Sequence, residues 1–283
     1  MKQFVTRPTA PSTPATFAKL LETAVHEPGL ISTAYTAFHS YSLGNQLLAW
    51  SQCVERGIQP GPIATFPNWK ELGRHVRKGE KALALCQPVT VKRKATAADD
   101  GTEEPDAYTR FTYRNSWFVI SQTEGEPLPE PSIPTWNKDR ALAELDIQET
   151  AFDGLDGNCL GCARGRSIAI NPVNPMPWKT RFHELAHVLL GHTSEGEQSD
   201  GELTPRNLRE CEAESVALLC CAALGLPGVE CSRGYIQAWW GHGNEIPERS
   251  AQRILKVADA ILKAGHDRCV SQKRQTDDVR AVA

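Results

Sequence analysis

Apolar residues recur at helical spacing over much of this chain and at strand spacing in a few short runs. Residues 17–56 carry apolar positions three and four apart, which predicts helices. The runs ALALCQPVTV (82–91) and SWFVIS (116–121) are short and apolar, with β-branched or aromatic residues, which favours strands. Helices with a small sheet in the first half, followed by a mainly helical second half, predict an α+β protein of two domains.

The second half of the chain has a strand pattern followed by two helix patterns. The segment GRSIAINP (165–172) predicts a short strand. Residues 177–192 predict a helix that is closed by Gly191, and residues 204–225 predict another. For this last helix we expect Thr204 as the N-cap, Pro205 as the first helical residue and Gly225 just past the end.

Changes in composition mark the expected domain boundaries. The stretch EGEPLPEPSIPTW (124–136) is rich in proline and glycine, which predicts an extended connector. The expected segments are a disordered tail (1–15), a first domain (16–125) with an acidic loop (95–107), a proline-rich linker (126–136), a second domain (137–265) and a polar tail (266–283).

The overall composition is that of an ordinary globular chain. Hydrophobic residues make up 40% of it and charged residues 23%, and the net charge is −3. Its apolar stretches are shorter than the ~20 residues of a membrane-spanning helix, and residues 1–17 lack the apolar core of a signal peptide. We therefore expect a cytoplasmic protein with no membrane contact.

Nine cysteines raise the question of disulfides or a metal site. Their odd number and the expected reducing compartment favour free thiols. Cys159 and Cys162 form one CxxC, which is a weak indication of metal or redox chemistry without a second pair. Cys220 and Cys221 lie in an apolar helix pattern, where we expect small buried hydrophobes.

Residues 183–187 read His-Glu-Leu-Ala-His, an HExxH motif within a helix pattern. Positions i and i+4 of a helix share a face, so His183 and His187 can converge on one metal ion with Glu184 beside them. Apolar residues at the spacing i, i+3, i+4, i+7 form the opposite face, which predicts that the histidines do not face the core. These apolar residues are Phe182, Leu185, Ala186 and Leu189.

A catalytic zinc site needs a third protein ligand. His192 follows the helix-ending Gly191, and we expect it to be a cap or surface residue. Glu210 and Glu214 share a face of the next helix, and a cation there would offset their repulsion. We predict Glu210 as the ligand and Glu214 as an acid that orients a zinc-bound histidine. Glu212 is rotated about 200° from Glu210, so its substitution should leave zinc bound.

The order of strand, HExxH helix and glutamate helix resembles the thermolysin-type (gluzincin) arrangement. HELAHVLLGH followed by ECEAESVA resembles the metallopeptidase domain of ArdC-type antirestriction proteins and, more distantly, of ImmA/IrrE regulators. This resemblance implies Zn²⁺ as the cofactor, a protein or peptide as the substrate and Glu184 as the general base. Tyr235, His242 and Arg233 are open candidates for stabilising an oxyanion, each with a structural role as the alternative.

The first region is locally basic. Between Phe66 and Lys94 there are eight Lys or Arg residues and two acids. The segments FHSYSLGNQLLAW, WKELGRHVRKGEK and SQTEG resemble the single-stranded-DNA-binding domain of ArdC-like proteins, and such binders combine cationic grooves with stacking aromatics. A core position is the alternative for Trp50 and Trp69. The expected DNA-contacting residues are Tyr41, Asn45, Trp69, Arg74, Arg77, Lys78 and Lys81.

Together these observations predict a single-stranded-DNA-binding protein with a zinc-dependent metallopeptidase domain. The resemblance implies a role in antirestriction or DNA protection. The alternative is a non-enzymatic protective protein that binds single-stranded DNA and holds a structural or vestigial zinc.

Overall fold

The computed structural model describes residues 15–92, 107–129, 133, 135–154, 158–193 and 205–266. The expected N-terminal tail, nearly all of the acidic loop and of the polar C-terminal tail, part of the linker and Thr204 lie outside these residues. The helices are α1 (Phe17–His26), α2 (Leu30–Phe38), α3 (Leu43–Arg56), α4 (Phe66–Glu71), α5 (Lys138–Glu144), α6 (Pro177–Leu189), α7 (Arg206–Leu224), α8 (Val229–Gly241) and α9 (Glu248–Ala264). The strands are β1 (Ile63–Thr65), β2 (Arg74–Val76), β3 (Leu83–Lys92), β4 (Ala107–Val119), β5 (Thr123–Gly125), β6 (Gln148–Thr150), β7 (Gly161–Arg164) and β8 (Ser167–Ile170).

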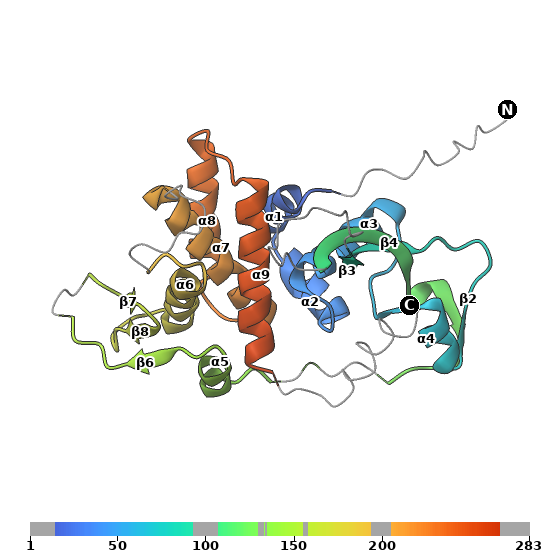
Figure 1. Cartoon of the computed structure of the whole chain (residues 1–283), viewed down its shortest axis with the longest axis horizontal. Coiled ribbons are helices and arrows are strands. Elements are labelled where there is room, and N and C mark those ends of the chain that lie inside the picture. Colours follow the sequence, from blue (N-terminus) through green and yellow to red (C-terminus); the bar gives the residue numbers. More distant parts are fainter. Residues whose placement is uncertain are drawn as a thin grey trace, which may run out of the picture.

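The α+β class predicted from the sequence is confirmed. The first half contains helices with a three-stranded sheet of order β1-β4-β3 and a two-stranded ribbon of β2 and β5. The second half is mainly helical, with a small sheet of order β6-β8-β7 beside α6 (Figure 1). The helix expected to begin at Pro205 begins at Arg206, and Pro205 is its N-cap.

The N-terminal helices pack directly on the C-terminal ones. Helix α9 contacts both α1 and α3, and α2 contacts α7. Helix α9 lies between the other C-terminal helices and the N-terminal ones (Figure 1). Apolar side chains from both halves form one continuous core. The boundaries predicted around residues 126–136 remain a prediction, but the two sides of that boundary share this core.

Helix α9 also caps two of the N-terminal helices. The carboxylate of Glu248 accepts hydrogen bonds from the backbone amides of Phe17 (3.1 Å) and Ala18 (2.8 Å) at the start of α1. Asp259 accepts a 3.0 Å bond from the amide of Leu43, the first residue of α3. Each acid therefore satisfies amides that would have no partner within their own helix and complements the positive end of the helix dipole.

The expectations for cysteines and for membrane contact can be compared with the described part of the chain. The eight cysteines there are free thiols, and Cys220 and Cys221 are fully buried, as expected. None of the described helices is both long and apolar enough to cross a membrane.

Candidate metal centre

The HExxH motif lies on helix α6, which has one apolar, buried face and another side that carries both histidines. Phe182, Leu185 and Ala186 are completely buried and hold the helix against the core. His183 and His187 lie on the other side, with 16% and 14% of their side chains exposed. The amphipathic pattern thus fixes the direction in which both imidazoles point.

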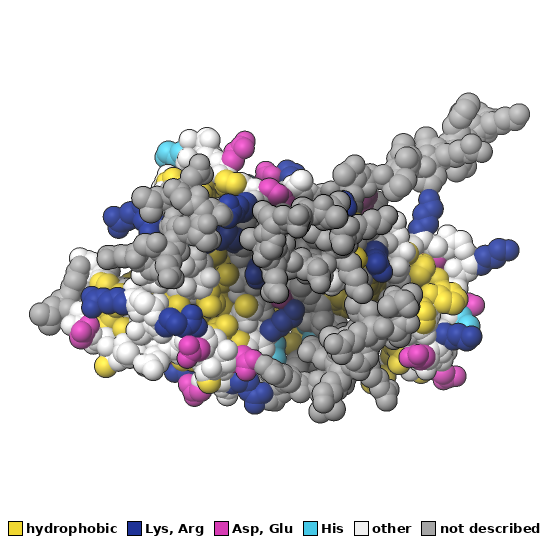
Figure 2. All heavy atoms as spheres, in the orientation of Figure 1, with side chains coloured by type: hydrophobic (Ala, Val, Ile, Leu, Met, Phe, Trp, Pro, Cys, Tyr) yellow, Lys and Arg dark blue, Asp and Glu magenta, His cyan; other side chains and the backbone are white. Residues whose placement is uncertain are grey.

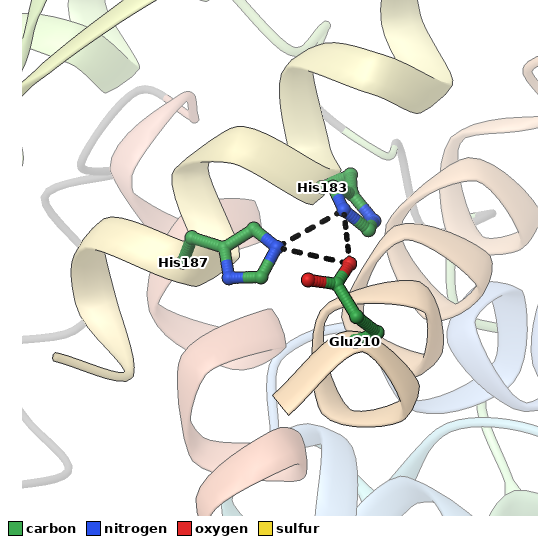
Figure 3. Close-up of side chains that lie close together, drawn as sticks. All are labelled: His183, His187 and Glu210. Carbon is green, nitrogen blue, oxygen red and sulfur yellow. Dashed lines mark hydrogen bonds and ion pairs between the residues drawn. The ribbon is translucent and has the colours of Figure 1, made fainter. Parts of the chain in front are cut away.

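The two histidines and Glu210 converge on one point. Their side chains extend toward one another from α6 and from the first turns of α7 (Figure 3). The Nε2 atoms of His183 and His187 are 3.0 Å apart. Oε2 of Glu210 lies 3.4 Å from Nε2 of His183 and 3.6 Å from Nε2 of His187.

These separations fit a divalent metal ion. Tetrahedral zinc with bonds of about 2.0–2.1 Å keeps its ligand atoms about 3.3–3.4 Å apart, close to the three separations here. The imidazoles lower the pKa of Glu210 through hydrogen bonding and charge, so this carboxylate is ionised as a ligand must be. Two imidazoles and one carboxylate suit zinc and other first-row divalent ions alike.

Glu184 lies beside the ligands, against strand β7. A Cβ atom at Gly161 would come 3.3 Å from Cγ of Glu184 and 2.6 Å from Cγ2 of Thr180, so the glycine permits the close approach of α6 to β7. Burial raises the pKa of Glu184, and the nearby Glu210 adds to this effect. A carboxylate with a raised pKa next to a metal site is suited to accepting and returning a proton.

Glu214 is placed differently from the prediction. Its Oε1 atom is 3.7 Å from Nδ1 of His183, which is longer than a hydrogen bond. Instead, the carboxylate pairs with Lys179 at 2.5 Å and accepts a 2.7 Å bond from the hydroxyl of Ser232. Glu214 is thus the nearby acid that the spacing predicted, but its hydrogen bonds join α6 to α8.

Of the two alternatives expected for His192, a surface position was wrong, whereas its amide does cap helix α6 by bonding to the carbonyl of His187. The side chain of His192 is only 3% exposed and lies inside the protein, between His187 and Glu212. The signal in the sequence was Gly191, which adopts φ +77° and turns the chain back over the last turn of α6. Glu212 faces away from Glu210, as its rotation predicted, and is completely buried.

The candidates for oxyanion stabilisation separate clearly. Arg233 is buried and donates to the backbone carbonyl of Val25. His242 bonds to the carbonyl of Ala238 at the end of α8. Tyr235 remains partly exposed, and its pKa is raised by burial and by the charges of Glu210 and other nearby groups. Of the three, Tyr235 is therefore the one placed near the metal ligands.

Four of the expected DNA-contacting residues have structural roles. Trp69 is 1% exposed and donates its indole N–H to Phe118, so the alternative of a core position holds for it. Arg74 is buried, with its guanidinium bonded to Thr123 and to neighbouring carbonyls of the β2–β5 ribbon. Asn45 bonds to both backbone groups of Cys86, and Tyr41 donates to the carbonyl of Ile63. The polar groups of these four side chains thus have partners within the protein.

The remaining expected DNA contacts lie on the surface. Lys78 and Lys81 are exposed, whereas Arg77 is partly held by Glu80 and by the carbonyl of Ser121. On the face drawn in Figure 2, Lys and Arg side chains of the described residues are interspersed with Asp and Glu. Of the eight basic residues between Phe66 and Lys94, Arg93 and Lys94 lie outside the described residues.

The sequence analysis missed a pair of exposed aromatic side chains on β4. Phe111 is 68% exposed and Tyr113 is 43% exposed. They are two residues apart on a strand and therefore share a face. Arg110 and Arg114, also exposed, flank them on the opposite face. The signal in the sequence is the alternation along YTRFTYRN (108–115), which places Phe111 and Tyr113 on one strand face and Arg110 and Arg114 on the other.

This protein combines an α+β fold with an HExxH helix and a following helix that carries Glu210. Its fold resembles the Mn(II)-bound crystal structure of the antirestriction ArdC protein from plasmid R388, with a TM-score of 0.52 and 19% identity over 89% of this chain and 97% of that one. The metal-free structure of the same protein gives a TM-score of 0.50 and 20% identity over 88% and 94% of the two chains. Residues 22–118 match the family model for the N-terminal domain of the anti-restriction factor ArdC. Residues 22–118 are therefore similar to the N-terminal domain of ArdC, and the fold of the chain is similar to that of ArdC.

A curated relative extends this comparison. An uncharacterized protein of Bacillus anthracis is 24% identical to this chain, in an alignment that covers 80% of this chain and 45% of that protein. The chain thus spans about half the length of this relative.

Proposed function

We propose that this protein protects DNA from restriction, and that it does so with a metal-dependent peptidase centre joined to a region that binds single-stranded DNA. The match of residues 22–118 to the ArdC N-terminal domain supports the DNA-protecting role. The convergence of His183, His187 and Glu210 around one point, with Glu184 beside them, is the observation that carries the peptidase.

Each residue of the centre has a separate task. His183, His187 and Glu210 would hold Zn²⁺, which when bound acidifies water and polarises a carbonyl group. Glu184 accepts the proton of the attacking water and returns it to the leaving amine. Its side chain is held for this task between α6 and β7.

Metal content and hydrolysis together test the centre. We expect the purified protein to bind one Zn²⁺, and His183→Ala and Glu210→Ala to lose it. Glu184→Gln should keep the metal and lose cleavage of itself or of a DNA-bound protein by at least ~100-fold. Glu230→Gln, which changes an exposed glutamate on α8, should alter neither property. Equal turnover in Glu184→Gln and the wild type would contradict the role of Glu184, and a zinc-loaded wild type that cleaves nothing would leave only the non-enzymatic protective protein.

The exposed aromatics of β4 are our candidates for base stacking, and the exposed Lys78 and Lys81 are our candidates for phosphate contacts. Phe111→Ala and Tyr113→Ala should each weaken binding of a labelled single-stranded oligonucleotide, by about 1–3 kcal/mol for each stacked base. Lys78→Ala with Lys81→Ala should flatten the dependence of affinity on salt. Val173→Ala, an exposed apolar residue of the other half, is the control. Duplex DNA bound as tightly as single strands would contradict the proposed preference.

A further inference from the structure

A buried chain of polar groups leads from His187 into the protein. Nδ1 of His187 lies 3.0 Å from Nδ1 of His192. Nε2 of His192 lies 2.9 Å from Oε2 of Glu212 on helix α7. The ring of His192 therefore connects a residue of the metal centre to a carboxylate that has no contact with that centre.

The end of helix α6 places His192 in this position. The amide of His192 bonds to the carbonyl of His187, and the amide of Gly191 bonds to that of Val188. With Gly191 in the left-handed region, these two bonds form a Schellman motif. In such motifs the residue after the glycine commonly packs against the residue five positions earlier. Here the two residues are His192 and His187, so an apolar contact is replaced by a hydrogen bond.

The protons along this chain can be assigned in one consistent way. His187 presents Nε2 to His183 and Glu210, so with a metal ion bound at Nε2 its ring proton is on Nδ1. That Nδ1–H donates to the unprotonated Nδ1 of His192. The Nε2–H of His192 then donates to the carboxylate of Glu212. Every nitrogen in the chain thus has one role, with neutral imidazoles and an ionised acid.

The surroundings of the chain agree with this assignment. The side chain of His192 is only 3% exposed, and that of Glu212 is completely buried. The carboxylate of Glu212 is in contact with His192, with Ser250 and, at 4.0 Å, with Arg253. Ser250 and Arg253 belong to α9, so the chain ends on the helix that also caps α1 and α3. A fully buried carboxylate without such partners would cost several kcal/mol.

We propose that His192 and Glu212 are positioning residues that hold the imidazole of His187 in the tautomer and orientation in which its Nε2 binds metal. This role rests on the proposed metal centre and deepens it. It differs from the expectation that substitution of Glu212 leaves zinc binding unaffected. His183, by contrast, has no hydrogen-bond partner for Nδ1 among the described residues, so the chain fixes one of the two histidines more firmly than the other.

Two substitutions of His192 separate positioning from packing. His192→Phe keeps a ring of similar size but removes both nitrogens, and we expect it to weaken Zn²⁺ binding by about 10- to 100-fold. His192→Gln supplies a carbonyl oxygen to accept from His187 and an amide to donate to Glu212, and it should restore most of this loss. The measurement is the dissociation constant for Zn²⁺ in competition with a chromophoric chelator, with Co²⁺ absorption as the signature of ligand geometry.

Glu212→Gln provides a second measurement that does not depend on the His192 variants folding. It keeps an acceptor for His192 but removes the charge, so we expect a smaller loss of affinity than in His192→Phe. Ser215→Ala changes another buried polar residue of α7 and should bind Zn²⁺ as the wild type does. The melting temperature of each metal-free variant shows whether the fold is intact.

The results distinguish this inference from the proposed function. Zn²⁺ affinity and Co²⁺ spectra unchanged in His192→Phe and Glu212→Gln would overturn the positioning role while leaving the metal centre in place. Equal losses in His192→Phe and His192→Gln, with both folded, would also overturn it, because packing would then explain the effect. A wild-type protein that binds no metal would instead contradict the metal centre itself.

Discussion

Glu149 and Arg181 connect the metal-binding helix to its neighbouring sheet. Oε1 of Glu149 on β6 lies 2.7 Å from one terminal nitrogen of Arg181 on α6, and its Oε2 lies 3.1 Å from Nε. Both side chains are largely buried. The hydrogen bonds and charge of Arg181 lower the pKa of Glu149, although burial opposes this. The pair therefore stabilises the folded state only while Glu149 is ionised.

This pair predicts a stability difference that depends on pH. A glutamate whose folded pKa is below its unfolded value of about 4.3 contributes full stability above that value. The contribution is lost as the pH falls through the folded pKa. At pH 7 we expect Glu149→Gln to lower the free energy of unfolding by about 1–3 kcal/mol, and the difference from wild type to shrink below about pH 4. Urea unfolding at several pH values measures it, with Glu71→Gln on the exposed surface of α4 as the control.

At the scale of residues, the sequence predicts the side chains that converge at the candidate centre but not all of their partners. Helix periodicity alone places His183 and His187 on one face of α6, and the spacing of Glu210 and Glu214 places both on one face of α7. His192 was missed because its position depends on the turn at Gly191 and on a glutamate of another helix. The indole of Trp69 was ambiguous, because periodicity does not tell a stacking aromatic from a core one.

At the scale of elements, the approach of β7 to α6 depends on Gly161. A Cβ atom there would meet Thr180 and Glu184 on α6 and the carbonyl of Ala169 on β8. Gly161→Ala should therefore cost about 1–3 kcal/mol of stability through overpacking. It should also displace Glu184, so that hydrolysis falls more than metal affinity does.

At a second glycine, on α8, we expect alanine to have the opposite effect on stability. Gly234 lies in the interior of α8, and a Cβ atom there would meet nothing within 4 Å. Gly234→Ala should raise the free energy of unfolding by about 0.5–1 kcal/mol because alanine loses less backbone entropy in a helix. Denaturant titrations of both variants test the pair, and a destabilised Gly234→Ala would contradict the open surroundings of α8.

The elements themselves were largely predictable. The helices in residues 17–56, the HExxH helix and the strands around 83–92 and 116–119 follow from their apolar periodicity. The antiparallel pairing of β2 with β5 did not, because it joins residues about 50 positions apart and each strand has only three residues. Arg74 donates a hydrogen bond to Thr123, and Gln122 donates one to the carbonyl of Lys81. These bonds join the two segments around this ribbon that resemble ArdC.

At the scale of the whole molecule, the shared core predicts that the two halves unfold together. Asp259→Ala removes the carboxylate on α9 that caps α3, and we expect the free energy of unfolding to fall by about 1–2 kcal/mol. Because α9 also packs on α7, metal release should shift to lower temperature along with the unfolding of the N-terminal helices. Calorimetry and a chelator signal recorded on the same sample measure both events.

The matched control for this prediction is Asp139→Ala on α5, whose side chain is 85% exposed. It should leave both signals almost unchanged. Metal release at an unchanged temperature in Asp259→Ala would show that the halves are independent. Sequence patterns could not supply this coupling, because the amphipathic pattern of α9 shows that it has a buried face but not which helices cover that face.

The caps that α9 supplies also affect how the protein is made. Glu248 and Asp259 lie 216 to 231 positions after the amides that they bind. A growing chain therefore completes α1, α2 and α3 long before the ribosome has added the helix that covers and caps them. Contacts between residues this distant in sequence slow folding, and apolar surface that stays exposed until they form promotes aggregation. The nascent N-terminal helices should thus be clients of ribosome-associated chaperones until residues 248–264 emerge.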